Sequence, residues 1–254
     1  MSVMMQNIIP SGASSLYRNN FRFLIDAANT NPGVPSGFSI VSQIPDQSGN
    51  GYILDFTDEI WRTSPINYFE GKKNTSNVVL ESSGGTPLLI SNPTEFSISC
   101  WTRSTSGDVG KICGFQDSAT SLGAPFWSSG NYDRHIYVGD DGDIRFGCQN
   151  GATKVSINGG YVNDNIWKYV VATYADGVMS LYINSQLRAT QSSVGVGNYS
   201  GYWRLFAYSL GGYASASTIQ CFSGDIAFAS VYNICLSSGQ INQNFLTLRS
   251  RFGV

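Results

Sequence analysis

Hydrophobic and polar residues alternate along most of the chain, in short runs separated by glycine, proline, asparagine, aspartate and serine. A period of two is typical of a strand with one buried face, and the separating residues are typical of turns. The runs predict strands at residues 21–26, 38–41, 52–56, 78–80, 96–102, 111–115, 135–138, 144–148, 154–157, 167–174, 179–183, 203–208 and 222–231. Because the connections are too short for crossover helices, the pattern predicts an all-β fold, a two-sheet antiparallel sandwich.

Two hairpins are predicted by their turn residues. Residues 135–146 and 170–183 each contain an Asp-Gly pair between two alternating runs. Glycine accepts the positive φ that a tight turn requires, so each pair favours a short connection between antiparallel strands. We expect the two hairpins to lie side by side in one sheet.

One short C-terminal helix is predicted at residues 237–246. Ile241 and Phe245 recur there at helical spacing, after the N-cap candidate Ser237. We expect this helix to pack on the edge of the sandwich.

The chain is predicted to form one domain, residues 21–254, preceded by an N-terminal arm, residues 1–20, because no linker or change of composition divides it. The arm is apolar enough to need a partner surface. Its candidate assembly residues are Met4, Met5, Ile8 and Ile9. A frayed terminus is the alternative interpretation.

Charged residues are sparse, at 13% of the sequence against the roughly 25% usual in soluble domains, and the formal net charge is −2. The basic residues are scattered, which disfavours nucleic-acid binding. No apolar run is long enough to span a membrane, and the first residues do not resemble a signal peptide, so we expect no membrane insertion. The five cysteines form no C-x-x-C pair, and we expect buried free thiols.

The stretch WKYVVATYADGVMSLYINSQLRAT, residues 167–190, is similar to a segment of concanavalin A-like, laminin G-like jelly rolls. Further segments with this resemblance follow in the family's order at residues 68–71, 96–101 and 222–233. The resemblance covers residues 21–250 and implies a jelly-roll sandwich. One departure is Asn184-Ser185, where the family has Asn-Gly.

A narrower resemblance concerns residues 23–29 (FLIDAAN) and 44–51 (IPDQSGNG), which look like the opening of laminin G-like domains in tailed-bacteriophage virion proteins. It implies a non-enzymatic structural or decoration protein of a virion, in the capsid or in a fibre or tail attachment. Such a protein would assemble in the host cytoplasm, with other virion proteins as partners and as a homo-oligomer. The alternative is a carbohydrate-binding adhesin module that recognises a surface glycan.

Catalysis is not expected from this sequence. Glycan-cleaving enzymes of this fold use an E-x-D-x-x-E strand, because two carboxylates must stand about 5 Å apart. None of the glutamates belongs to such a motif; they are Glu59, Glu70, Glu81 and Glu95. The lone histidine, His135, has no nucleophile motif near it, so we interpret it as an exposed or a structural imidazole rather than a catalytic base.

Calcium is one of two interpretations of the acidic loop that holds Asp140, Asp141 and Asp143. Carboxylates suit calcium, but aspartate and glycine are also what a hairpin turn requires, and no glutamate follows to complete a calcium loop. Asp46 with Asn50 is a second candidate for calcium, which the resemblance to polar loop sites of the family implies. No other cofactor is expected.

Candidate contact residues are aromatic, because glycan sites combine exposed rings with polar side chains. Two segments have both ingredients, residues 126–132 and 199–204. Their candidate residues for contact with a glycan or a partner protein are Trp127, Tyr132, Tyr199, Tyr202 and Trp203. Aromatic residues of a sandwich also occur in the core or against a neighbouring subunit, and these alternatives remain open.

Overall fold

The computed structural model describes residues 16–17, 20–72, 77–81, 88–117, 130–207, 209–216 and 221–254. These residues are mainly β-structure, and the named strands all pair antiparallel. The strands are β1 (Phe21–Asp26), β2 (Ser39–Pro45), β3 (Ile53–Arg62), β4 (Tyr68–Glu70), β5 (Asn77–Glu81), β6 (Phe96–Arg103), β7 (Gly110–Gln116), β8 (Tyr132–Val138), β9 (Asp143–Asn150), β10 (Thr153–Tyr161), β11 (Lys168–Ala175), β12 (Val178–Ile183), β13 (Gln186–Gln191), β14 (Tyr202–Leu205) and β15 (Asp225–Tyr232). A 3-10 turn, η1 (Ala27–Asn29), follows β1, and one helix, α1 (Ser238–Phe252), ends the chain.

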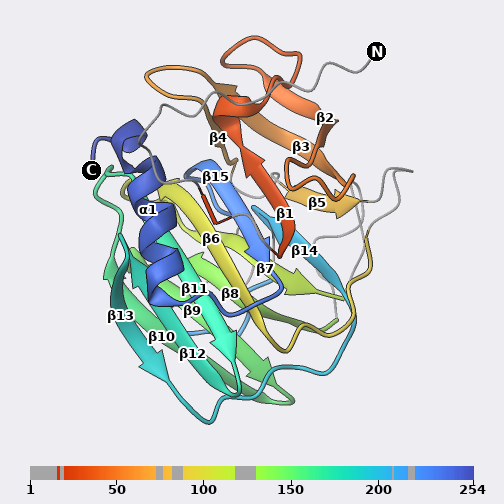
Figure 1. Ribbon diagram of the computed structural model, residues 1–254, viewed down its shortest axis with the longest axis vertical. Coiled ribbons are helices and arrows are strands. Elements are labelled where there is room, and N and C mark those ends of the chain that lie inside the picture. Colours follow the sequence, from red (N-terminus) through yellow and green to blue (C-terminus); the bar gives the residue numbers. More distant parts are fainter. Residues whose placement is uncertain are drawn as a thin grey trace.

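The strands form two sheets packed face to face (Figure 1). The helix-side sheet runs β15-β6-β11-β12-β13, with β1 beside β15. The opposite sheet runs β10-β9-β8-β7-β14-β5-β3, with β2 beside β3. The short strand β4 pairs with both β3 and β15 and so joins the sheets at one edge. This arrangement confirms the predicted all-β, two-sheet antiparallel jelly-roll sandwich.

The main core lies between the sheets and is rich in aromatic rings. Phe96 of β6 packs against Tyr174 of the same sheet and against Phe146 and Trp203 of the opposite sheet, with ring centres 5.5, 6.2 and 5.6 Å away. Trp203 packs in turn on Phe115, at 5.0 Å. Rings that interlock across two sheets fix their separation and their register.

Helix α1 begins with a capping box at Ser237, whose hydroxyl accepts a hydrogen bond from the Gln240 N–H. It ends at Gly253, which has the left-handed conformation (φ 72°) typical of a C-cap. The helix therefore extends beyond the predicted end at residue 246. It lies on the outer face of the helix-side sheet rather than on the sandwich edge (Figure 1).

A second core forms between α1 and the helix-side sheet. The Trp101 ring of β6 stacks on Phe252 at 4.0 Å and on Phe245 at 5.9 Å. Because Trp101 points to the helix while Phe96 and Ile98 point into the sandwich, β6 is buried on both faces. The helix thus shields one face of a central strand from water.

The two predicted hairpins exist as β8–β9 and β11–β12, but the expectation that they share a sheet is wrong. They belong to opposite sheets, because β11 pairs with β6 on the helix side and β8 pairs with β7 on the other. A period-two pattern specifies which face of a strand is buried and leaves its neighbours unspecified. The pattern also missed β4, which is short, and β13, which is largely exposed.

The departure at Asn184-Ser185 does not break the turn between β12 and β13. Both residues adopt positive φ, 50° and 63°. The Asn184 side chain also accepts a hydrogen bond from the Tyr169 N–H at 2.9 Å. A side chain that bonds to nearby backbone stabilises this conformation in place of the family's glycine.

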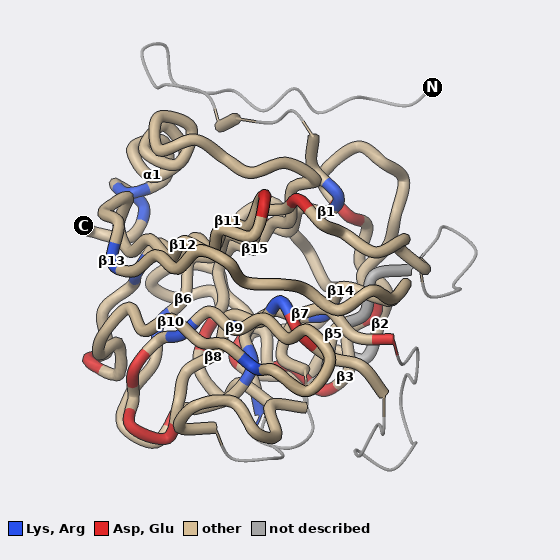
Figure 2. Tube along the Cα trace, turned by 90° about the horizontal axis from the view of Figure 1, so that it is seen from below, with Lys and Arg blue, Asp and Glu red and all other residues tan. Residues whose placement is uncertain are grey.

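Charges are scattered over the described part of the trace and form no continuous basic stripe (Figure 2). The cysteines Cys100, Cys113, Cys148 and Cys221 are buried free thiols, as predicted, and Cys235 is half-buried and free. Among the described residues no helix has the length and apolar character needed to cross a membrane.

Removal of the Phe245 side chain should weaken the second core. Phe245 is 8% exposed and stacks on Trp101. We expect Phe245→Ala to lower the free energy of unfolding by about 3–5 kcal/mol, since a buried ring is lost and a cavity remains. Urea unfolding followed by tryptophan fluorescence measures the change.

Leu246→Ala is the matched control for Phe245→Ala, because Leu246 is the next helical residue and is 49% exposed. We expect it to stay within about 0.5 kcal/mol of the wild-type chain. Equal losses in the two variants would contradict packing of α1 through Phe245.

Candidate functional site

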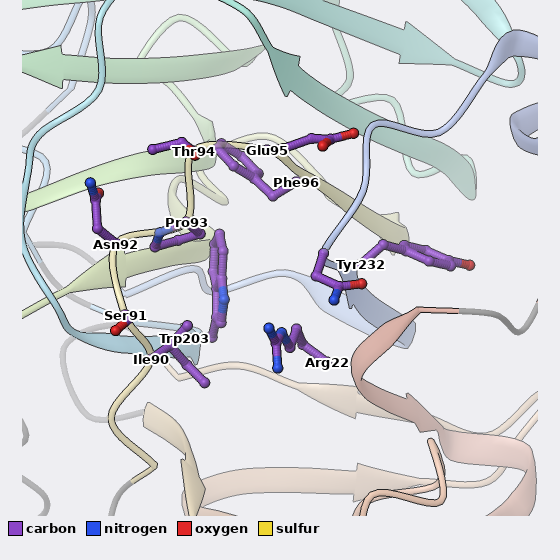
Figure 3. A pocket seen from close by; sticks show the side chains of 11 residues that line it. Arg22, Ile90, Ser91, Asn92, Pro93, Thr94, Glu95, Phe96, Trp203 and Tyr232 are labelled. Carbon is purple, nitrogen blue, oxygen red and sulfur yellow. The ribbon is translucent and has the colours of Figure 1, made fainter.

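A pocket of about 240 Å³ opens at one end of the sandwich (Figure 3). Segments far apart in the sequence form its wall: β1, the loop before β6, β14 and the end of β15. The lining residues are Arg22, Ile90, Ser91, Asn92, Pro93, Thr94, Glu95, Phe96, Trp203, Tyr232 and Asn233. We call this the end pocket.

The end pocket has an apolar floor and a polar rim. Phe96 and Trp203 reach it from the main core and are almost fully buried. Ser91, Thr94 and Asn233 are exposed around it. An apolar base with a few polar groups around it is the usual composition of a small-molecule site.

The rim loop is tied to the sandwich by its backbone. Ile90 and Gly201 form a bridge with N–H to O distances of 2.7 and 2.9 Å. The Arg134 guanidinium donates to the Pro93 carbonyl oxygen at 3.0 Å and to the Asn92 side-chain oxygen at 2.7 Å. These bonds hold the rim loop in place before any ligand arrives.

Arg134 itself is fully buried. Its guanidinium lies 5.1 Å from the centres of the Phe115 and Tyr199 rings and forms an ion pair with Asp133. The Tyr199 hydroxyl donates to Asp133 at 2.6 Å. Burial raises the pKa of Asp133 although Arg134 opposes this, and burial together with Asp133 raises the pKa of Tyr199. The donors around Asp133 satisfy this buried carboxylate.

Four polar side chains of the end pocket have no partner among the described residues. Arg22, Ser91, Thr94 and Asn233 make no side-chain hydrogen bond or ion pair there. Their donors and acceptors are available to a ligand. Glu95 differs, because its carboxylate accepts a hydrogen bond from the Cys235 N–H at 3.0 Å.

A β-bulge positions Arg22. Phe21 pairs with Tyr232 and Phe23 pairs with Val231, so Arg22 is the additional residue on β1. Phe21 therefore packs toward α1 while Phe23 packs into the main core. A bulge redirects a side chain in this way, and here it directs Arg22 to the end pocket.

Trp203 is the one predicted contact residue among those described that lines the end pocket. Tyr132 and Tyr199 line a separate cavity of about 20 Å³, which has room for a water molecule only. Tyr202 lies next to Trp203 on β14 and lines neither cavity. Trp127 lies outside the described residues.

Sequence reasoning missed the polar side chains of the end pocket. Arg22 read as an ordinary outward residue of an alternating strand, and the bulge that redirects it has no pattern in a single sequence. The rim residues 91–94, Ser-Asn-Pro-Thr, read as a turn. Asn233 is the last residue of the segment 222–233 that resembles the family, and nothing in that segment indicates a contact with a ligand.

The Tyr132 ring lies beside two lysine side chains on the opposite sheet. The Lys154 ammonium lies 4.7 Å from its ring centre and the Lys111 ammonium 5.9 Å. Burial, together with nearby Arg204, lowers the pKa of Lys111 to about 7. Burial and Lys111 lower the pKa of His135 well below its usual value. The predicted structural role of His135 agrees with this buried position.

The acidic loop closes a turn with its own carboxylates. Asp141 forms a two-point ion pair with Arg145 at 2.7 and 2.6 Å, which lowers the Asp141 pKa. Asp143 accepts from the Asn158 side chain at 2.7 Å, and the Asp140 N–H donates to the Ser215 carbonyl oxygen at 2.6 Å. A guanidinium at this point disfavours a cation, and the described residues contain no cluster of three or more metal-ligating side chains. Calcium at Asp140, Asp141 and Asp143 stays a prediction.

Asp46 and Asn50 fasten β1 to the neighbouring loop. The Asp46 carboxylate accepts from the Leu24 N–H at 2.5 Å and from Ser48. The Asn50 side chain donates to the Phe21 and Arg22 carbonyl oxygens at 2.9 and 3.3 Å. The second resemblance segment therefore supports the backbone that carries Arg22.

The candidate assembly residues Met4, Met5, Ile8 and Ile9 lie outside the described residues. The end of the arm contacts its own domain. The Tyr17 N–H donates to the Asn244 side chain at 2.7 Å, and the Tyr232 hydroxyl donates to the Tyr17 carbonyl oxygen at 3.2 Å. The division at residue 20 stays a prediction.

Residues 72–242 match the profile of the concanavalin A-like lectin/glucanases superfamily. The matched region is more than half of the chain, so the chain belongs to this superfamily. No curated protein matches the sequence.

Solved structures share the fold at low sequence identity. The binding domain of botulinum neurotoxin serotype D superposes with a TM-score of 0.59 and 14% identity, over 90% of this chain and 52% of that chain. The binding domain of Paraclostridial Mosquitocidal Protein 1 gives 0.58 and 13%, over 90% and 52%. Botulinum neurotoxin type C, whose cell entry depends on two ganglioside molecules, gives 0.60 and 16%, over 91% and 52%. At such low identity the structural likeness establishes the fold alone. The chain spans about half the length of these neighbours.

Burial of Lys111 should make folding stability depend on pH. Its folded pKa of about 7 lies below the usual 10.5, so the unfolded chain binds more protons between these values, and stability rises with pH there. We expect Lys111→Met to remove this contribution. The stability difference between variant and wild type should shrink from pH 7 to pH 10.5, with a slope approaching about 1.4 kcal/mol per pH unit.

Urea unfolding midpoints at pH 7, 8, 9 and 10 measure how the stability of the wild-type chain and of Lys111→Met depends on pH. Buried groups that Lys111 does not influence contribute alike to both chains, so the difference between the two profiles reports Lys111 together with its effect on the Cys113 thiol. Parallel profiles would show that Lys111 stays protonated in the folded chain.

Proposed function

We propose that the chain is a carbohydrate-binding module and that the end pocket holds one terminal sugar residue. The observation that carries the proposal is the pocket itself, in which the buried indole of Trp203 forms part of the floor and hydroxyl, amide and guanidinium groups with no partner among the described residues surround it. A sugar ring presents hydroxyls at its edge and C–H groups on its faces, and therefore suits such a lining.

Membership of a lectin and glucanase superfamily supports this proposal. The fold neighbours add to it through their ligands. One type C neurotoxin structure concerns ganglioside binding, and the binding domain of neurotoxin DC occurs in complex with SialylT. Since this chain spans 52% of those chains, their ligands support a glycan in general and no particular subsite.

Binding without cleavage is the form of function that the end pocket favours. Among the residues that line it, Glu95 is the one carboxylate, and the Cys235 N–H already donates to it. Hydrolysis by the common mechanism needs a pair of carboxylates on opposite sides of the scissile bond. Glu70 is paired with Arg62, and Glu59 is buried away from solvent.

The virion role inferred from the second resemblance stays a prediction, as do its partners, its homo-oligomeric state and its location in a particle. An adhesin module in a fibre would unite that role with the present proposal. Glycan recognition does not require it.

A glycan array with the full chain tests the proposal. We expect wild-type protein to bind a subset of glycans that share a terminal sugar. Asn233→Ala should weaken that binding roughly tenfold, because a hydrogen bond to a ligand is lost while no bond within the protein breaks. Biolayer interferometry on the best glycan measures the change.

Gln191→Ala is the matched control, since Gln191 is exposed on β13 and its side-chain amide makes no hydrogen bond to the residues that the structure describes. It should bind as wild type does. Absence of any glycan binding, or equal loss in the two variants, would overturn the proposal. Release of free sugar from a bound glycan would instead indicate an enzyme.

A further inference from the structure

We infer that the end pocket selects a saccharide whose terminal residue carries an anionic substituent, a carboxylate or a sulfate ester, and that Arg22 binds that substituent. The inference rests on the proposed function and deepens it. It assigns Arg22 as the residue that determines specificity.

The Arg22 guanidinium is a permanent cation whose charge nothing neutralises among the described residues. It forms no ion pair and no hydrogen bond there, whereas Arg62, Arg103, Arg134, Arg145 and Arg251 each pair with a carboxylate. In Figure 3 the guanidinium end of Arg22 is directed toward the Trp203 ring. A planar group with parallel N–H donors matches the oxygen atoms of a carboxylate or sulfate in two-point contact.

The one carboxylate of the pocket does not oppose Arg22. Glu95 accepts a hydrogen bond from the Cys235 N–H, and in Figure 3 its carboxylate points away from Arg22, beyond Phe96. No ion pair joins the two residues. An anionic ligand group would therefore meet an attractive field rather than a balanced one.

The backbone that carries Arg22 is also held in place before a ligand binds. The bulge with β15 fixes its direction, and the Asn50 side chain holds the carbonyl oxygens of Phe21 and Arg22. Phe21 packs on Tyr232 with ring centres 4.5 Å apart. A backbone fixed on both sides of Arg22 lowers the entropy that binding would otherwise cost.

The size of the pocket limits what it holds. At about 240 Å³ it is smaller than the roughly 300–1,000 Å³ of sites for drug-sized ligands. One sugar ring with its substituent is therefore the unit that enters, and the rest of the glycan extends into solvent. Ser91, Thr94 and Asn233 are the groups left to bind the ring hydroxyls and any amide substituent.

The test compares matched glycans that differ only at the terminus. The probes are N-acetyllactosamine unmodified, capped with N-acetylneuraminic acid, capped with glucuronic acid, and sulfated on the terminal galactose. We expect wild-type protein to bind at least one acidic probe about tenfold or more tightly than the neutral one, with a preference that falls as salt rises. The carboxylated and sulfated arms identify which anion is used.

Variants at position 22 assign the preference to the guanidinium. Arg22→Gln should lose about tenfold to hundredfold in affinity for the acidic probe and less than about twofold for the neutral one. Arg22→Lys should retain part of the preference, because the charge remains while the two-point geometry is lost. Arg188→Gln on exposed β13 makes the same change of net charge and should behave as wild type.

Each outcome has a separate meaning. Equal binding of neutral and acidic probes, or an acidic preference that survives Arg22→Gln, would overturn the inference and leave the carbohydrate-binding module in place. Absence of binding to every probe, together with an empty glycan array, would overturn both. Thermal melts of the variants show whether any loss reflects unfolding instead.

Discussion

The buried ion pair between Asp133 and Arg134 is the interaction on which the end pocket depends. A guanidinium without solvent contact is expensive to bury, and its donors must all find acceptors. Asp133 of β8 supplies one acceptor, and Asn92, Pro93 and Gly197 supply the others from two loops. The requirement to satisfy one cation therefore ties these two loops to β8, in addition to the contacts that Ile90 and Val196 make with the main core.

The rest of the fold depends on strand β6, which is covered by packed side chains on both of its faces. Strand β6 packs into the sandwich through Phe96 and under α1 through Trp101. Its first residue contributes to the pocket floor, so the strand that anchors the helix also forms part of the site. The pocket is in this way continuous with both cores, and its apolar base is a part of the packing that stabilises the chain.

The sequence predicted what periodicity and turn chemistry encode: most of the strands, the two Asp-Gly hairpins, the N-cap of the helix at Ser237 and the antiparallel sandwich. It did not predict which strands are neighbours, because β8–β9 and β11–β12 have similar patterns and lie in opposite sheets. For the site, aromatic residues in polar loops were a partial guide. Trp203 lines the end pocket, whereas the Tyr199 hydroxyl donates a hydrogen bond to Asp133 of the buried ion pair, and the Tyr132 ring packs against Lys111 and Lys154. The side chain that matters most, Arg22, is placed by a bulge against a strand more than two hundred residues away in the sequence, and local patterns carry no trace of such a contact.

The residues that line the pocket come from two parts of the chain, one within the region that matches the superfamily profile and one before it. The superfamily match begins at residue 72, so the rim loop, Trp203 and Asn233 come from the matched region, while the charged wall comes from a strand that precedes it. Strand β1 lies along one edge of β15, and its Phe23 and Ile25 pack in the main core. The bulge turns Arg22 out of the alternating pattern, so a substitution at this one position changes the charge of the pocket while Phe21 and Phe23 keep their places in the two cores.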